Sequence, residues 1–105
     1  MPNGEDRNFV RFIGCIGGFR DRFNKWPTKM KLDPDFIEEL TEVLPPEDFQ
    51  KLTRKMELIA DDSNPWDGLY VAEDGEGHVY DLMKSGHGGK QNDVLRWLCV
   101  SWPNY

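Results

Sequence analysis

The chain of 105 residues is poor in the side chains that build disulfide frameworks and metal sites, with only two cysteines and two histidines. Cys15 and Cys99 are too few for a disulfide framework, and we expect both to remain thiols in a reducing compartment. Neither cysteine has the short spacing to His78 or His87 that zinc ligands show. We therefore expect no structural metal. No cofactor-binding motif is complete, so we expect no cofactor either.

Long hydrophobic runs are also absent. No stretch approaches the ~18 apolar residues that a membrane-spanning helix needs, and the polar, acidic start MPNGEDRN lacks the layout of a signal peptide. These absences predict a cytoplasmic protein without a membrane partner. The length predicts a single α+β domain over residues 1–105, with residues 1–7 disordered.

What the sequence does contain is charge, and it is unevenly distributed. Thirteen lysines and arginines stand against 19 aspartates and glutamates, which gives a net charge of −6. Residues 1–32 carry +4, residues 33–83 carry −12 and residues 84–105 carry +2. Blocks of opposite sign either pair across the surface or leave one basic and one acidic face.

The first half of the chain has the clearest signals for regular structure. The run FVRFIGCI at residues 9–16 is apolar on both faces of an alternating pattern, so it predicts a central strand. Residues 28–32 predict a short second strand with Met30 and Leu32 facing inward. Asp33 is a good N-cap and Pro34 suits the first helical position, so we expect a helix over about residues 34–44.

A second helix is expected directly afterwards, over about residues 46–54, because Pro45-Pro46 ends the first and suits the start of the next. Residues 56–60 fit both a helical and an alternating pattern, and we favour a strand because a meander follows. In that meander, GLYVAED and GHVYDLM flank the turn signal Asp74-Gly75.

A short C-terminal helix is expected to start near Asn92 and to end near Trp102. The order of elements predicts an α+β fold. It comprises a mostly antiparallel sheet of about four to five strands, on which the two consecutive helices and the C-terminal helix pack.

Acidic residues and tryptophans indicate a surface for a protein partner. Trp66 and Trp102 stand beside prolines in expected loops, and tryptophan is a frequent interface anchor, although such rings also cover small cores. The acidic candidates are Glu38, Glu42, Asp61 and Asp62. We therefore expect a small regulatory or protein-interaction module without catalytic activity.

An alternative hypothesis is a nucleic-acid or phosphate-ligand binder. Single-stranded nucleic acids are bound by cations mixed with aromatic rings, and the basic N-terminal third supplies Arg11, Arg20, Arg22 and Lys25. The glycine-rich loop 85–90 suits an anion and adds Lys84, His87 and Lys90. The net charge of −6 makes nucleic acid the less favoured partner.

Catalysis is the least supported hypothesis. A cysteine nucleophile would need Cys15 to act with His78 or His87, because a thiolate requires a nearby base or cation. Cys15 lies in an apolar run, which instead predicts an inert, buried thiol. We assign no catalytic residue.

Overall fold

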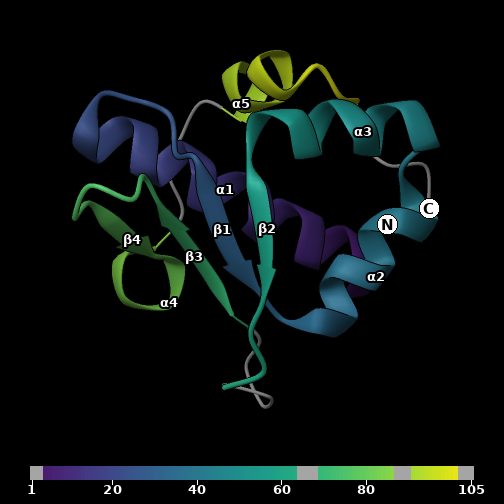
Figure 1. Cartoon of the computed structure of the whole chain (residues 1–105), viewed down its shortest axis with the longest axis horizontal. Coiled ribbons are helices and arrows are strands. Elements are labelled where there is room, and N and C mark those ends of the chain that lie inside the picture. The colour runs from purple at the N-terminus through teal and green to yellow at the C-terminus, as the bar shows by residue number, and fades with distance from the viewer. Residues whose placement is uncertain (1–3, 64–68, 87–90, 102–105) are drawn as a thin grey trace.

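The structure is a computed structural model that describes residues 4–63, 69–86 and 91–101, with side chains described from residue 8 onward. Within these ranges the chain forms five helices and a four-stranded mixed sheet, which confirms the predicted α+β class (Figure 1). No helix in the described part of the chain combines the length and the apolar character required to cross a membrane.

The sheet contains β1 (Lys29–Leu32), β2 (Glu57–Ala60), β3 (Tyr70–Glu73) and β4 (Val79–Asp81), in the order β2-β1-β3-β4. Two of its strand pairs, β1 with β3 and β3 with β4, are antiparallel, as predicted for most of the sheet. β1 and β2 are parallel. A parallel pair needs a long crossover connection, and the two helices between β1 and β2 provide it.

The largest departure from the sequence prediction is α1 (Gly4–Phe23), a helix of 20 residues. The prediction of a central strand over residues 9–16 is therefore wrong. The aromatic and branched residues of α1 lie three or four apart and are fully buried: Phe9, Phe12, Ile13, Ile16 and Phe19. Since the middle of α1 is buried on most sides, its short apolar run cannot be told from a buried strand by periodicity alone.

The start of α1 also corrects a second expectation. The helix begins at Gly4, so residues 4–7 of the segment predicted to be disordered are helical. Residues 1–3 lie outside the described part of the chain.

Small residues let α1 lie directly against the sheet. A Cβ atom on Gly18 would collide with the ring of Tyr80 in β4. One turn earlier, the Cys15 thiol donates to the carbonyl oxygens of Tyr70 and Tyr80, at 3.4 and 3.5 Å. Gly18, which lowers the helix propensity of α1, therefore permits its close packing.

The two consecutive helices are confirmed as α2 (Pro34–Val43) and α3 (Pro46–Lys55). Asp33 caps α2 as predicted, because its Oδ1 accepts a hydrogen bond from the Asp35 backbone N–H at 3.1 Å. β2 confirms that the ambiguous segment 56–60 is a strand.

The hairpin of β3 and β4 is also confirmed, with Gly75 and Gly77 at positive φ in its turn. The second strand is shorter than predicted, since it ends at Asp81. The Asp81 carboxylate accepts from the Met83 N–H at 3.0 Å, and this cap starts the short helix α4 (Leu82–Ser85).

The expected C-terminal helix is α5 (Gln91–Leu98). It ends earlier than predicted, because Cys99 takes a left-handed conformation with φ of 63°. The Cys99 and Val100 N–H groups donate to the Arg96 and Leu95 carbonyls, at 3.2 Å each, which is the Schellman pattern of helix ends.

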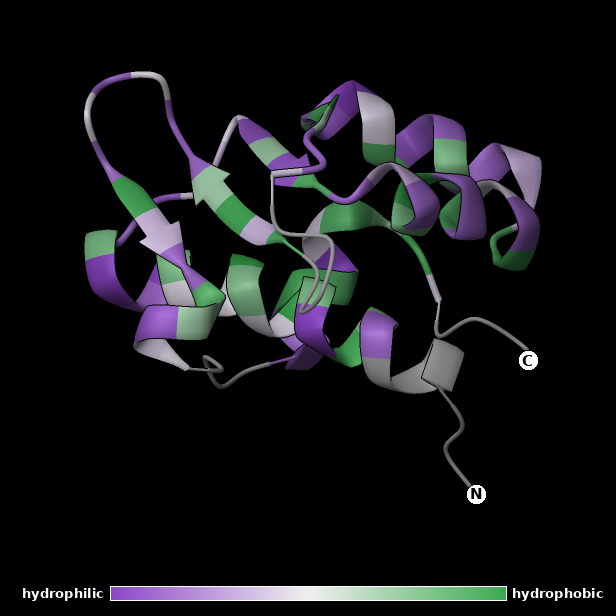
Figure 2. Ribbon diagram, turned by 90° about the horizontal axis from the view of Figure 1, so that it is seen from below, coloured by the Kyte–Doolittle hydropathy of each residue, from purple (hydrophilic) through white to green (hydrophobic). Residues whose placement is uncertain are grey.

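The strand register places the core on one face of the sheet. Met30 pairs with Ala72, which pairs with Tyr80, and all three are buried. Met30 and Leu32 therefore face inward as predicted. The opposite face is mostly polar, with Lys31 and Glu73 joined in an ion pair of 3.4 Å. Figure 2 shows the resulting alternation of hydrophobic and hydrophilic residues along the ribbons.

Candidate functional site

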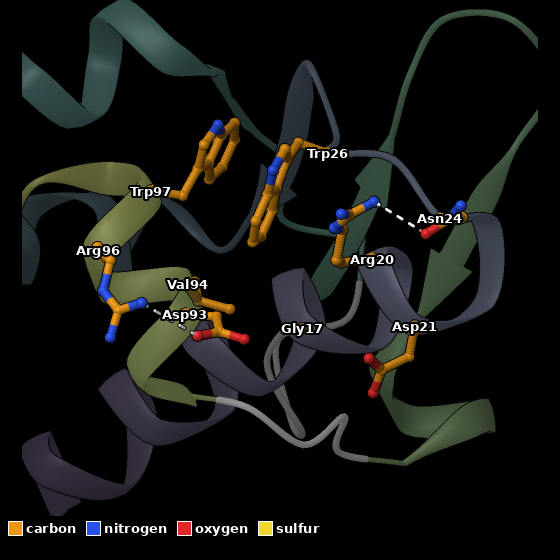
Figure 3. A pocket seen from close by; sticks show the side chains of 9 residues that line it. All are labelled: Gly17, Arg20, Asp21, Asn24, Trp26, Asp93, Val94, Arg96 and Trp97. Atoms are coloured by element: carbon orange, nitrogen blue, oxygen red, sulfur yellow. Dashed lines mark hydrogen bonds and ion pairs between the residues drawn. The ribbon is translucent and has the colours of Figure 1, made fainter.

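A hollow of about 430 Å³ lies between α1 and α5 (Figure 3). α1 and the segment after it contribute Gly17, Arg20, Asp21, Asn24 and Trp26, and α5 contributes Asp93, Val94, Arg96 and Trp97. Glycine at position 17 places no side chain in this wall. The hollow therefore combines aromatic surface with charges of both signs.

Two stacked tryptophans form one side of the hollow. The rings of Trp26 and Trp97 have centroids 4.5 Å apart and an interplanar angle of 6°. Figure 3 shows Arg20 on the other side of Trp26, with its Cζ 5.2 Å from the ring centroid. Lys55 lies over Trp97, with its Nζ 5.9 Å from that centroid. We call these four residues the indole stack. Cations over both rings stabilise the arrangement.

The cations of the indole stack are held by rings and amides rather than by acids. Arg20 Nη1 donates to Asn24 Oδ1 at 3.2 Å. Across the residues that the structure describes, neither Arg20 nor Lys55 takes part in an ion pair. Arg96, on the other side of the hollow, pairs with Asp93 at 3.7 Å.

The helices that line the hollow both end in an unusual backbone conformation. Asn24, with φ of 57°, follows α1, and Cys99, with φ of 63°, follows α5. Elsewhere in the described ranges, positive φ occurs only at glycine. A left-handed residue is common after a helix, where glycine and asparagine are favoured, so Cys99 is the strained one of the two.

A second polar cluster lies at the hairpin turn. Potential metal-ligating atoms of Asp74, Glu76 and His78 all lie within 4.8 Å of one another. Lys25 pairs with Asp74 and also with Glu76, at 3.2 Å to the latter. Because this ammonium contacts both carboxylates, the chain itself supplies a cation to the cluster.

The hydrogen bonds of this cluster explain the acidity of Asp74. His78 Nδ1 lies 2.7 Å from Asp74 Oδ2, and the Glu76 and His78 N–H groups donate to Oδ1 at 2.8 and 3.2 Å. Burial opposes ionisation, but Lys25 and these donors hold the pKa of Asp74 well below its ordinary value. In return, the hydrogen bond to Asp74 raises the pKa of Lys25.

The possible nucleophile Cys15 is buried, as predicted from its apolar neighbours. Burial raises the pKa of its thiol to about 12, so Cys15 is a thiol rather than a thiolate at neutral pH. His78 lies at the hairpin turn, against Phe23 and Asp74. His87 falls outside the described residues.

The basic residues predicted to bind anions have separate partners. Arg22 lies over the Tyr80 ring, at 5.0 Å, and donates to Ser85 Oγ at 3.3 Å. Burial raises the pKa of Tyr70 to about 12, and the positive charge of Arg11 opposes this rise. Arg20 belongs to the indole stack and Lys25 to the hairpin cluster. Of the loop candidates, Lys84 is exposed in α4, whereas His87 and Lys90 lie outside the described ranges.

The acidic candidates lie on another part of the molecule. Glu38 and Glu42 are exposed one turn apart on α2. Asp61 and Asp62 follow β2, and Asp61 accepts from the Ser63 N–H at 2.9 Å. Hydrogen bonds with Ser63 lower the pKa of Asp61. The predicted anchors Trp66 and Trp102 fall in segments that the structure does not describe.

Sequence reasoning did not select the residues of the hollow, apart from Arg20. The stack joins Trp26 and Trp97 from opposite ends of the chain, and no spacing rule relates such distant positions. The content of four tryptophans was the one available signal.

Comparison with known proteins found no match to the chain among protein-family models, curated proteins or solved structures.

Proposed function

We propose that this protein is a noncatalytic protein-interaction module, and that a partner side chain docks in the hollow between α1 and α5. The observation that carries the proposal is the indole stack at the side of this hollow. Tryptophan and arginine dominate the residues that contribute most to protein interfaces. Stacked rings are already ordered, so binding costs them little conformational entropy.

The dimensions and charges of the hollow support the same proposal. A volume of about 430 Å³ is at the smaller end of the roughly 300–1,000 Å³ range of binding pockets. It suits one large side chain of a partner. Arg96 and Asp93 are 81% and 51% exposed in their side chains, so they form a polar rim around the apolar wall.

Two candidate reactive groups in the described part of the chain are held in ways that disfavour covalent chemistry. The Cys15 thiol is buried with a raised pKa, and the Asp74 carboxylate is engaged by Lys25 and His78. These features favour binding over catalysis.

Site-specific photocrosslinking in the native host tests the proposal. A photoreactive amino acid is placed at Arg96, on the rim of the hollow, and in a matched protein at the exposed Glu42 of α2. We expect a covalent adduct with a defined protein from position 96 and none from position 42. Adducts from position 42 alone would move the interaction to the acidic face of α2. Adducts from neither position would contradict the proposed function.

A further inference from the structure

The partner's chemistry can be inferred from the cations of the indole stack; this inference rests on the proposed function. We propose that the surface binds an acidic, extended segment of a partner protein, with one carboxylate at Arg20, one at Lys55 and an apolar side chain between them in the hollow.

The first support is the lack of acidic partners for these cations. Lys25, Lys31 and Lys51 are each paired with a carboxylate of the chain. Arg20 and Lys55 form no such pair within the ranges described. Their charges are thus held in place by aromatic rings, and their N–H groups can bind carboxylates from outside.

Stacking favours this use of Arg20 in particular. The N–H groups of a guanidinium point outward in its own plane, so a guanidinium that lies over a ring can still bind a carboxylate with two parallel hydrogen bonds. The Asn24 amide receives one Nη1 hydrogen bond at 3.2 Å, which fixes the orientation. Arg20 is therefore preorganised for a carboxylate beside the hollow.

The spacing of the two cations fits a short peptide. From Arg20 to Lys55 the stack extends through successive separations of 5.2, 4.5 and 5.9 Å. An extended chain rises about 3.3 Å per residue, so no more than about five residues are needed to reach both ends. One residue between the carboxylates can direct its side chain into the hollow.

A second hollow continues the surface beyond Lys55. It measures about 490 Å³, and Lys55 lies in its wall together with Arg54, Phe49 and Leu58. α3 and α5 are in contact, and Figure 1 shows them next to each other. A bound segment can thus pass from one hollow to the other over Lys55. In a chain of net charge −6, Arg54 adds a further cation along this path.

A nucleic acid is also acidic, but the indole stack does not favour it. Proteins bind single strands by stacking bases on open aromatic faces. Trp26 has Trp97 over one face and Arg20 over the other (Figure 3). Lys55 lies over Trp97. Because both faces of Trp26 are covered and a cation lies over Trp97, carboxylates of a protein segment fit these cations better than a stacked strand.

Selection from random peptides displayed on phage tests the inference with the full-length chain. We expect the selected peptides to share two acidic residues that flank an apolar one. Their affinities are then measured by fluorescence anisotropy for the wild type, R20Q and K55Q. Each variant should bind about tenfold more weakly, because each loses a charge-assisted hydrogen bond. The K84Q variant is the matched control, since Lys84 is exposed in α4, and its affinity should not change.

Other outcomes overturn the inference or the function separately. Selection of basic or uncharged peptides that W97A no longer binds would contradict the acidic partner and keep the hollow as the interaction site. Selected peptides that W97A binds as tightly as the wild type, or no selected peptide, would contradict the proposed function itself. If labelled oligothymidine binds the wild type and the R20Q variant binds it more weakly, the partner is a nucleic acid and the inferred protein partner is wrong.

Discussion

Arg20 and Lys25 are five positions apart at the end of α1, yet they belong to regions with opposite properties. Lys25 lies in the hairpin cluster, where Asp74 and Glu76 neutralise it. Arg20 lies in the indole stack, where a ring and an amide hold it without an acid. The difference shows that some cations of the basic N-terminal block form ion pairs with the acidic middle block, whereas others do not. Arg20 therefore remains available to a carboxylate of a partner, whereas Lys25 does not.

The largest expected effect on stability comes from disturbing the packing of α1 against the sheet, because α1 leads into both regions. The substitution Gly18→Ala places a Cβ atom against the Tyr80 ring and displaces α1 from the sheet. We expect the free energy of unfolding to fall by about 1–3 kcal/mol, as for other overpacked cores. Urea unfolding followed by far-ultraviolet circular dichroism measures it.

A double-mutant cycle identifies the cause of this loss. Tyr80→Ala removes the ring that the new Cβ atom would meet, so Gly18→Ala should cost much less in that background. An equal cost in both backgrounds would show that the collision is not responsible.

A smaller effect, present at neutral pH and lost in acid, is expected from breaking the hairpin cluster alone. The pKa of Asp74 is lower in the folded chain than in the unfolded chain. Its contribution to stability is therefore complete above the unfolded value of about 4 and is lost as the pH falls toward the folded value. Asp74→Asn should lower the melting temperature at neutral pH and flatten its decline below about pH 4.

Asp93→Asn is the matched control for the hairpin cluster, because Asp93 is half exposed in the hollow. Its melting temperature should decline with acid as in the wild type. An Asp74→Asn variant that declines as steeply as the wild type would show that Asp74 is not the group that titrates.

The smallest expected effect on stability concerns the end of α5, the helix that carries Trp97 of the indole stack. Cys99 has a left-handed backbone, which glycine adopts without strain. Cys99→Gly should therefore raise the free energy of unfolding by about 1 kcal/mol. Cys99→Ala retains the Cβ atom and should give no such gain. Equal stability of the two variants in thermal unfolding would show that the end of α5 is not strained.

Local signals in the sequence were sufficient for much of the fold. Asp33, Pro34 and Pro46 determine where α2 and α3 begin, because capping and proline geometry act over a few residues. The hairpin turn followed from Asp74-Gly75 for the same reason. Much less of the candidate site could be predicted from the sequence. Arg20 was selected, but its contacts with Trp26 and Asn24 were not foreseen.

By itself, then, the sequence determined the α+β class, the paired helices, the hairpin and the contrast between basic and acidic blocks. Only the tertiary structure decided that residues 9–16 are helical, since burial around α1 overrides local propensity. Likewise, only the fold decided which cations the acidic block neutralises. Lys25 meets Asp74 and Trp26 meets Trp97 through packing of distant segments, and the chemistry of neighbouring residues does not encode such contacts.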